Sequence, residues 1–330
     1  MDSQLHQDPC HSWLGAPIDA RPLFAPEHAA LMATLRDLAP ADWGNEAVPG
    51  WTVRDLAAHL LGDFYGRLSR DRDDHRAGPA FSPGETLEAF IHRVNREWVD
   101  AFSRVSPAAL ADTLDLMGGQ VTRFFERVDL HTPSLGVSWA GVDPAPMWLD
   151  SAREFTEFWT HRQQIRHAVG QDTDHDSRPL SVVLDTFMRA LPHTLHEVEA
   201  PVGTQIQVRV DGPADGIWAA TVTGAAGATG SVATTTDAES AGATTDAESA
   251  GATTATGPSG VATDARPPGS RWSLAEPALA RPAALVRLDA ETAWRLCTRG
   301  IQPDTALARA HIDGDRSLAE AACRIVSIVY

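Results

Sequence analysis

A glutamate and a histidine four residues apart, Glu157 and His161, are the first side chains in this sequence whose spacing suggests chemistry. They lie in the stretch WLDSAREFTEFWTHRQQIRHAV, where apolar residues recur at intervals of three and four, as in an amphipathic helix. Side chains four apart on a helix project from one face with Cβ atoms about 6 Å apart. One metal ion can therefore bridge Glu157 and His161.

A metal ion needs a third donor from a different element, and His59 is the candidate. It lies in the middle of VRDLAAHLLGD, a second helical stretch, on the face that carries Leu56, Leu60 and Asp63. Two imidazoles and one carboxylate with an open position are the ligand set of catalytic zinc sites. Zinc is the default ion for these donors, although nickel, manganese and iron accept them too.

The same spacing also has an ordinary explanation. A Glu and a His four apart often form a solvated surface pair, and a single helix histidine is often half-buried with its ring nitrogen satisfied. The chain has 13 histidines, so similar arithmetic could nominate Glu154 or His167. Spacing alone favours the ordinary explanation and does not establish a metal site.

The elements that must position these residues are helices. Four long amphipathic stretches indicate a helical bundle, and they cover residues 28–39, 53–68, 85–102 and 148–169. A further helical stretch over 111–128 precedes a long crossover loop at 134–146. Thr52 is a plausible N-cap, and Asp55 three residues on completes a capping-box-like start.

The C-terminal half has a different pattern. A helix is expected over 182–198, followed by a hairpin of two strands that flank DGPADG. Further strands are expected at 271–275, 283–289 and 308–314, and further helices at 290–300 and 315–329. The chain is therefore predicted to be an α+β two-domain protein, with a metal-binding helical bundle over 1–175 and an α+β domain over 181–330.

One internal segment differs from both halves in composition. Residues 225–270 are rich in Ala, Thr, Gly and Ser and contain TTDAESAGA twice, at 235–243 and 244–252. Two short repeats cannot stack into a solenoid. We expect a disordered, tolerated insertion in a hairpin loop, with a functional tether as the alternative.

Composition excludes several classes of function. The net charge is −17 and all 27 basic residues are arginine, with no local basic patch, so nucleic acid and anionic membranes are poor partners. The sequence shows neither a signal-peptide pattern nor an apolar run of membrane-spanning length, so a cytoplasmic protein is expected. Oligomeric state leaves no readable trace.

The three cysteines, Cys10, Cys297 and Cys323, are far apart and form no CxxC pattern, which argues against a disulfide framework and a cysteine-ligated metal. Cys297 and Cys323 lie in apolar helical stretches, where a structural role is expected and a nucleophilic one is not.

Three strings carry a resemblance to a known family: GWTVRDLAAHLLGD, the preceding LAPADW, and REFTEFWTHRQQIRHAVG. They resemble the mycothiol-dependent maleylpyruvate isomerase family, a branch of the DinB-like metal-binding four-helix bundles. The resemblance implies that His59, Glu157 and His161 are zinc ligands. The C-terminal half is similar to the sterol-carrier-like C-terminal domain of that family.

The resemblance also implies an activity. The bundle would present the metal to mycothiol, a low-molecular-weight thiol, and lower the pKa of that thiol so that the thiolate acts at neutral pH. In the isomerase reaction the thiolate adds to the double bond of maleylpyruvate, the resulting single bond rotates, and elimination gives fumarylpyruvate. Other members are expected to transfer the thiol to a small electrophile.

Two other classes of function stay open. In a non-catalytic metal-binding or regulatory module, the metal would merely stabilise the bundle, and a fourth protein ligand would favour this class. In a metal-dependent hydrolase, Asp63 would be the candidate general base.

Three residues are candidates to support the metal ligands. Asp55 and Asp63 flank His59 by four residues on either side and could accept its second ring N–H, although Asp55 has a sufficient role at the helix start. Gln164 stands where many relatives carry Asp. An amide cannot be a charged base, but it can orient His161 by a hydrogen bond.

Other conspicuous side chains have structural explanations. Arg162 and Arg166 could hold a substrate carboxylate, but pairing with acids on the bundle surface is the favoured interpretation. Core packing is likewise favoured over a role as pocket walls for the large aromatics, which are Trp51, Trp139, Trp159 and Trp294.

Overall fold

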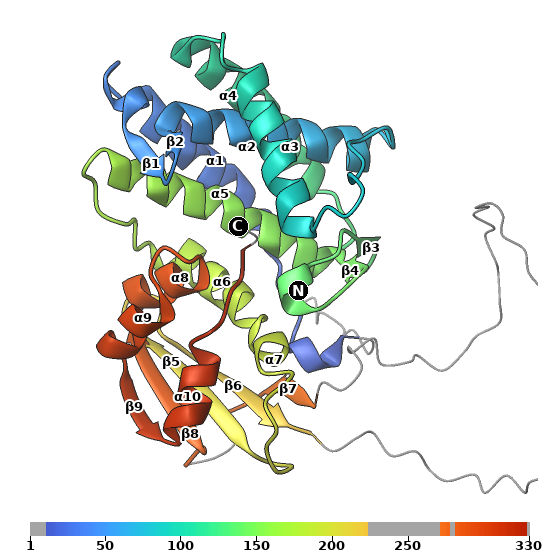
Figure 1. Ribbon diagram of the computed structural model, residues 1–330. Coiled ribbons are helices and arrows are strands. Elements are labelled where there is room, and N and C mark those ends of the chain that lie inside the picture. Colours follow the sequence, from blue (N-terminus) through green and yellow to red (C-terminus); the bar gives the residue numbers. More distant parts are fainter. Residues whose placement is uncertain (1–10, 224–270, 278–280, 329–330) are drawn as a thin grey trace, which may run out of the picture.

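The computed structural model describes residues 11–223, 271–277 and 281–328, and the expected insertion at 225–270 lies outside these residues. Figure 1 shows a helical region packed against a region that combines a sheet with helices. In the described part of the chain no helix is long and apolar enough to cross a membrane.

Five helices build the N-terminal region: α1 (Arg21–Arg36), α2 (Val53–Arg67), α3 (Leu87–Ala101), α4 (Pro107–Phe125) and α5 (Met147–Ala168). A π-helical turn, η3 (Leu68–Arg72), extends α2. Two short hairpins accompany them, formed by β1 (Glu46–Val48) with β2 (Trp51–Thr52) and by β3 (Pro133–Ser134) with β4 (Ala145–Pro146). All five stretches with helical periodicity are therefore helices.

The four helices that pack as a bundle are α1, α2, α4 and α5, whereas the sequence pattern had suggested the stretch of α3 in place of that of α4. Helices α1 and α2 each pack on α4 and α5, whereas α3 packs on α2 from outside. The sequence prediction was wrong in this membership, because α3 buries only Val99 fully while α4 buries residues along its whole length. A strongly amphipathic helix can thus lie on the surface of a bundle.

A glycine allows α3 to approach α2. A Cβ atom at Gly62 would lie 2.5 Å from the ring of Trp98, too close for any side chain. Trp98 in turn stacks on Tyr65 and on Phe102, with ring centroids 6.0 Å and 5.9 Å away. The outer helix is therefore attached through aromatic packing next to the middle of α2.

The C-terminal region contains a mixed five-stranded sheet. Its strands are β5 (Gln205–Asp211), β6 (Gly216–Val222), β7 (Trp272–Ala275), β8 (Ala284–Asp289) and β9 (His311–Gly314). Their order is β7-β6-β5-β8-β9, with β5 and β8 parallel and the other neighbours antiparallel. The predicted α+β character and the β5–β6 hairpin are confirmed, and the parallel pairing is new information from the structure.

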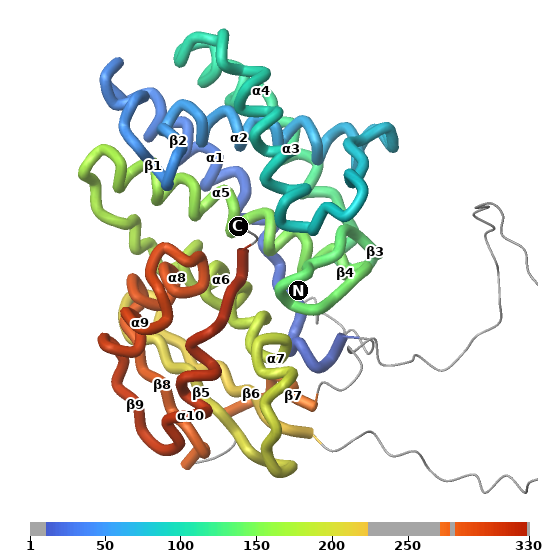
Figure 2. The backbone as a smooth tube through the Cα atoms, in the orientation of Figure 1, coloured from blue at the N-terminus to red at the C-terminus, as the bar shows by residue number. Residues whose placement is uncertain are grey.

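The helices around the sheet are α6 (Ser177–Met188), α7 (Leu191–Thr194), α8 (Ala290–Cys297), α9 (Pro303–Arg309) and α10 (Arg316–Ala322). The expected helix over 182–198 is divided in two, since Pro192 cannot donate the hydrogen bond that would continue α6. Helix α9 was not predicted, and α10 is shorter than expected. Figure 2 shows α6 between the helical region and the sheet.

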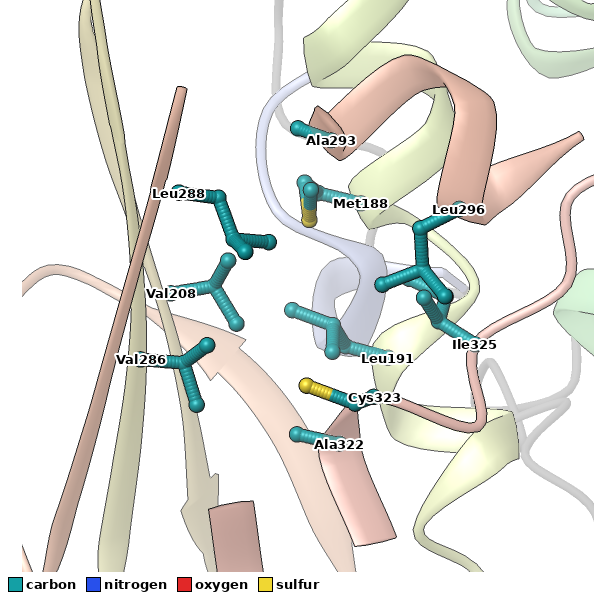
Figure 3. Close-up of a pocket in the computed structure, with 10 residues that line it drawn as sticks. All are labelled: Met188, Leu191, Val208, Val286, Leu288, Ala293, Leu296, Ala322, Cys323 and Ile325. Carbon is teal, nitrogen blue, oxygen red and sulfur yellow. The ribbon is translucent and has the colours of Figure 1, made fainter. Parts of the chain in front are cut away.

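The core between the sheet and its helices leaves a cavity of about 10 Å³ (Figure 3). Apolar side chains and the thiol of Cys323 line it. A cavity this small and apolar is a packing defect and offers no room for a ligand. Burial raises the pKa of Cys323 to about 11 and that of Cys297 to about 12, so both thiols stay protonated, as expected for structural cysteines.

A polar contact joins the two regions of the molecule. Glu291 of α8 accepts hydrogen bonds from the Thr173 hydroxyl (2.7 Å) and from the Trp294 indole (2.8 Å). The Thr173 hydroxyl also lies 2.8 Å from Nε2 of His167, near the end of α5. The ring of Trp294 packs edge-on against Trp159 of α5. The sheet region is therefore tied to the same helix that carries Glu157 and His161.

We expect Glu291→Ala to lower the free energy of unfolding by about 1–3 kcal/mol, because it leaves the buried Trp294 indole N–H without an acceptor. Urea unfolding monitored by tryptophan fluorescence measures the change. Glu320→Ala, which removes an exposed pair with Arg316, should change the stability by less than about 0.5 kcal/mol. Equal effects of the two substitutions would contradict this view of the contact.

Candidate metal centre

Helices α2 and α5 bring His59 and His161 next to each other inside the bundle, in an edge-to-face arrangement. The ring centroids are 5.0 Å apart and the ring planes are nearly perpendicular. Each histidine lies beside a carboxylate one turn away on its own helix: His59 Nε2 is 3.4 Å from Asp63 Oδ2, and His161 Nε2 is 3.4 Å from Glu157 Oε2. Four side chains that can donate to a metal, from two helices, thus lie in one part of the bundle.

The start of α2 is set by the capping box that the sequence suggested. The Thr52 hydroxyl accepts a hydrogen bond from the Asp55 backbone N–H, and the Asp55 carboxylate accepts one from the Thr52 N–H (3.0 Å). Asp55 is therefore occupied at the helix end, and its hydrogen bonds go to Thr52 and not to His59. Of the two flanking aspartates, only Asp63 lies beside the histidine.

Gln164 contacts His161 directly. Its side-chain oxygen lies 2.7 Å from His161 Nδ1. Because an amide oxygen only accepts hydrogen bonds, Nδ1 carries the hydrogen and Nε2 of the neutral ring presents a lone pair. His161 Nε2 is buried, and within the described residues it has no hydrogen-bond partner. A buried lone pair beside a carboxylate and a second imidazole fits a metal-binding role.

The electrostatic environment favours a neutral His59. Burial and the neighbouring His161 lower the pKa of His59 to about 3. Burial together with Glu154 and Glu157 raises the pKa of Asp63 to about 8. Although burial opposes it, contact with Glu157 raises the pKa of His161. The centre thus concentrates carboxylates and imidazoles in a region of low solvent access.

A buried ion-pair network continues along the α2–α5 contact. Arg67 donates to both oxygens of Asp150 (2.6 and 3.0 Å) and to Glu154 (2.6 Å). Arg153 donates to the same two carboxylates at 3.0 and 2.9 Å. Glu154, which spacing alone could have nominated as a ligand, is therefore committed to two arginines.

Trp51 and Arg96 lie next to the centre. The Trp51 ring centroid is 5.2 Å from that of His59, and the Arg96 guanidinium carbon is 5.8 Å from the Trp51 ring. Trp51 is only partly buried, so its expected role as a core anchor was incomplete. Arg96 was missed, since nothing in the spacing of α3 links it to a residue before α2. Trp139 and Trp159 are buried in the core as expected.

The two arginines after His161 do not lie as the sequence suggested. Arg162 is 2% exposed and forms a buried pair with Glu27 (2.5 Å) as well as an ion pair with Asp174 (2.9 Å). The prediction of a surface pair was wrong, because α1 supplies an acidic partner in the interior. Arg166 donates to the backbone carbonyl of Asp172.

The nitrogen and oxygen atoms of the four side chains in the centre are close together, but they do not surround a common point. Across the described ranges no set of three or more His, Cys, Asp or Glu side chains has the geometry of a metal site. Each histidine faces the carboxylate of its own helix instead. A metal ion held by His59, Glu157 and His161 is therefore a proposal, argued below.

A helical bundle with buried imidazoles and carboxylates on two facing helices defines the general class of the N-terminal region. Residues 24–166 match the family model of the mycothiol maleylpyruvate isomerase N-terminal domain. The helical region accordingly belongs to that domain family, as the sequence resemblance implied. A comparison with curated proteins finds no match.

Two solved structures are similar to the chain. One is a mycothiol-dependent maleylpyruvate isomerase, with 16% sequence identity and a TM-score of 0.40, and the other is a histidine-to-alanine mutant described by the same enzyme name, with 15% identity and a TM-score of 0.36. Each match covers 62% of this chain and 80% of the other.

Asp150→Asn should destabilise the protein by about 3–5 kcal/mol, because it leaves the buried charge of Arg67 partly uncompensated. Chemical denaturation gives the value. The control is Asp73→Asn, which removes the same charge from an exposed pair with Arg72 and should have little effect. A loss below about 1 kcal/mol for Asp150→Asn would argue against a stabilising role of this network.

Proposed function

We propose that this protein is a metal-dependent enzyme that activates a low-molecular-weight thiol, mycothiol, for attack on a small electrophile. The observation that carries the proposal is the buried Nε2 of His161, which has no hydrogen-bond partner among the described residues, lies 3.4 Å from Glu157 and belongs to a ring next to His59. Membership of residues 24–166 in a domain family named for a mycothiol-dependent isomerase supports the choice of thiol.

His59, Glu157 and His161 are the side chains that would hold the ion, with zinc as the default. When bound, such an ion supplies positive charge that lowers the pKa of a thiol, so that the thiolate is available at neutral pH. The lowered pKa of His59 agrees with this role, because only an unprotonated imidazole nitrogen binds a metal, whereas a metal at His161, whose pKa Glu157 raises, would displace a proton.

The other residues of the site have supporting roles in this proposal. Gln164 fixes the tautomer and the orientation of His161, the role that the sequence left open to an amide. Trp51 and Arg96 form an aromatic and cationic edge next to His59, suited to contact the substrate. The bundle core packed around the histidines limits the access of water.

The finer features implied by the resemblance belong to the same proposal. They are a DinB-like bundle within 1–175, a sterol-carrier-like domain within 181–330 and a cytoplasmic location. The reaction is either isomerisation, in which the thiolate adds reversibly to a double bond as in maleylpyruvate, or transfer of the thiol to a small electrophile. Both reactions begin with the same nucleophile.

Metal analysis tests the proposal first. Protein purified without a histidine tag should contain about one divalent ion per chain, and His59→Ala and His161→Ala should each lose it. Mycothiol, titrated calorimetrically, should bind the wild type but neither variant. His131→Ala, which removes an exposed histidine outside the site, should retain both properties. Wild-type protein that stays metal-free after reconstitution with zinc would sink the proposal.

Gln164→Ala should weaken zinc binding about 10- to 100-fold without abolishing it, because His161 keeps its donor nitrogen but loses the group that orients it. Competition with a chromophoric chelator measures the affinity. Gln164→Asp should bind zinc at least as tightly as the wild type, since a carboxylate accepts the same hydrogen bond. Gln171→Ala, at an exposed position just after α5, is the control. An equal loss of zinc affinity in Gln171→Ala would show that Gln164 has no specific role in orienting His161.

A further inference from the structure

Arginines pair with only some of the carboxylates along the α2–α5 contact. The guanidinium groups of Arg67 and Arg153 are matched by the carboxylates of Asp150 and Glu154, which they contact at hydrogen-bonding distance. Arg67 also pairs with Asp71, which Arg70 shares, so three arginines pair with three carboxylates. This set leaves out the two carboxylates nearest the histidines.

Those two carboxylates are Asp63 and Glu157. In the described ranges, neither has an ion pair with an arginine, and each has only the histidine of its own helix as a charged neighbour at salt-bridge distance. Each carboxylate oxygen lies 3.4 Å from the Nε2 atom of that histidine, which is longer than a normal hydrogen bond. A single metal ion between the two helices could accept both carboxylates as donors.

The positions of Asp63 and Glu157 on their helices also favour a shared metal ion. Asp63 lies one turn beyond His59 on α2, as Glu157 lies one turn before His161 on α5, so the two helices present equivalent His–carboxylate pairs to each other. His161, whose residue is 7% exposed, has an Nε2 without a hydrogen-bond partner in the described structure. The arrangement therefore contains two carboxylate donors, and the motif resemblance accounts for only one of them.

From this geometry we infer that Asp63 is a fourth protein ligand of the same metal ion, alongside His59, Glu157 and His161. The inference rests on the proposed metal centre and adds to its donor set. The Asp63 side chain is 31% exposed, against 17% for Glu157 and 9% for each histidine, so Asp63 forms the solvent-facing edge of the centre.

A fourth protein ligand would suit a non-catalytic metal-binding module, but at this exposed edge it is also compatible with thiol binding. Zinc centres can expand to five ligands, and a carboxylate at the exposed side leaves the more buried three donors in place. Asp63 would then belong to the metal centre itself, which is a different role from that of a hydrogen-bond acceptor that only orients His59.

The test compares Asp63→Asn with Asp71→Asn. Asp71 lies two turns further along the same helical path and pairs with Arg67 and Arg70, so its substitution removes the same charge without touching the proposed donors. Zinc affinity is measured by chelator competition, and the visible absorption spectrum of the cobalt(II)-substituted protein reports the donor set.

If Asp63 is a ligand, Asp63→Asn should lower zinc affinity by more than about 100-fold, beyond the range of an orienting residue, and should change the cobalt spectrum. Asp71→Asn should leave both unchanged. Asp63→Ser, measured in parallel, shows whether the effect depends on the asparagine side chain, and the circular dichroism of the metal-free variants checks that they fold.

Two results would overturn the inference. Asp63→Asn could retain wild-type affinity, or it could bind less tightly with an unchanged cobalt spectrum, which would assign Asp63 an orienting role. Failure of the proposed metal centre gives a different result, since the wild-type protein would then bind neither zinc nor cobalt. Wild-type protein that binds metal but no mycothiol would contradict the proposed function and leave the comparison of Asp63→Asn with Asp71→Asn valid.

Discussion

The contact between α2 and α5 places charged and ionisable side chains in the interior of a helical bundle, and the rest of the helical region depends on how they are paired. Arg67 and Arg153 neutralise Asp150 and Glu154 at one end of this contact. At the other end, His59 and His161 face each other with Asp63 and Glu157 beside them. Buried charge is costly when it is unpaired, so this line of residues constrains how the two helices can pack.

Packing on the outer side of α2 also fixes the position of this helix. Gly62 lets Trp98 of α3 lie directly against α2, one residue before Asp63. The capping box of Thr52 and Asp55 sets the other end of the helix. Helix α2 is thereby held at its N-terminal end and on its outer face, which positions His59.

Helix α5 links the candidate centre to the rest of the protein. It carries Glu157, His161 and Gln164 within two turns, and its last turn contacts Thr173, which is hydrogen-bonded to Glu291 of α8. Trp159, on the same helix, packs against Trp294. The C-terminal region is therefore attached to the element that supplies two of the four proposed ligands, and its placement bears on what can approach them.

Local pattern in the sequence was enough to locate five helices, the α2 capping box, the β5–β6 hairpin and the face of α5 that carries Glu157 and His161, because these features depend on residues close together in the chain. Only the tertiary structure decided that α4 and not α3 completes the bundle, that β5 pairs in parallel with β8, and that Arg162 meets Glu27 in the interior. It also placed Trp51 beside His59. These outcomes depend on which surfaces compete for burial and which charges find partners far along the chain, and periodicity within one helix contains no information about either.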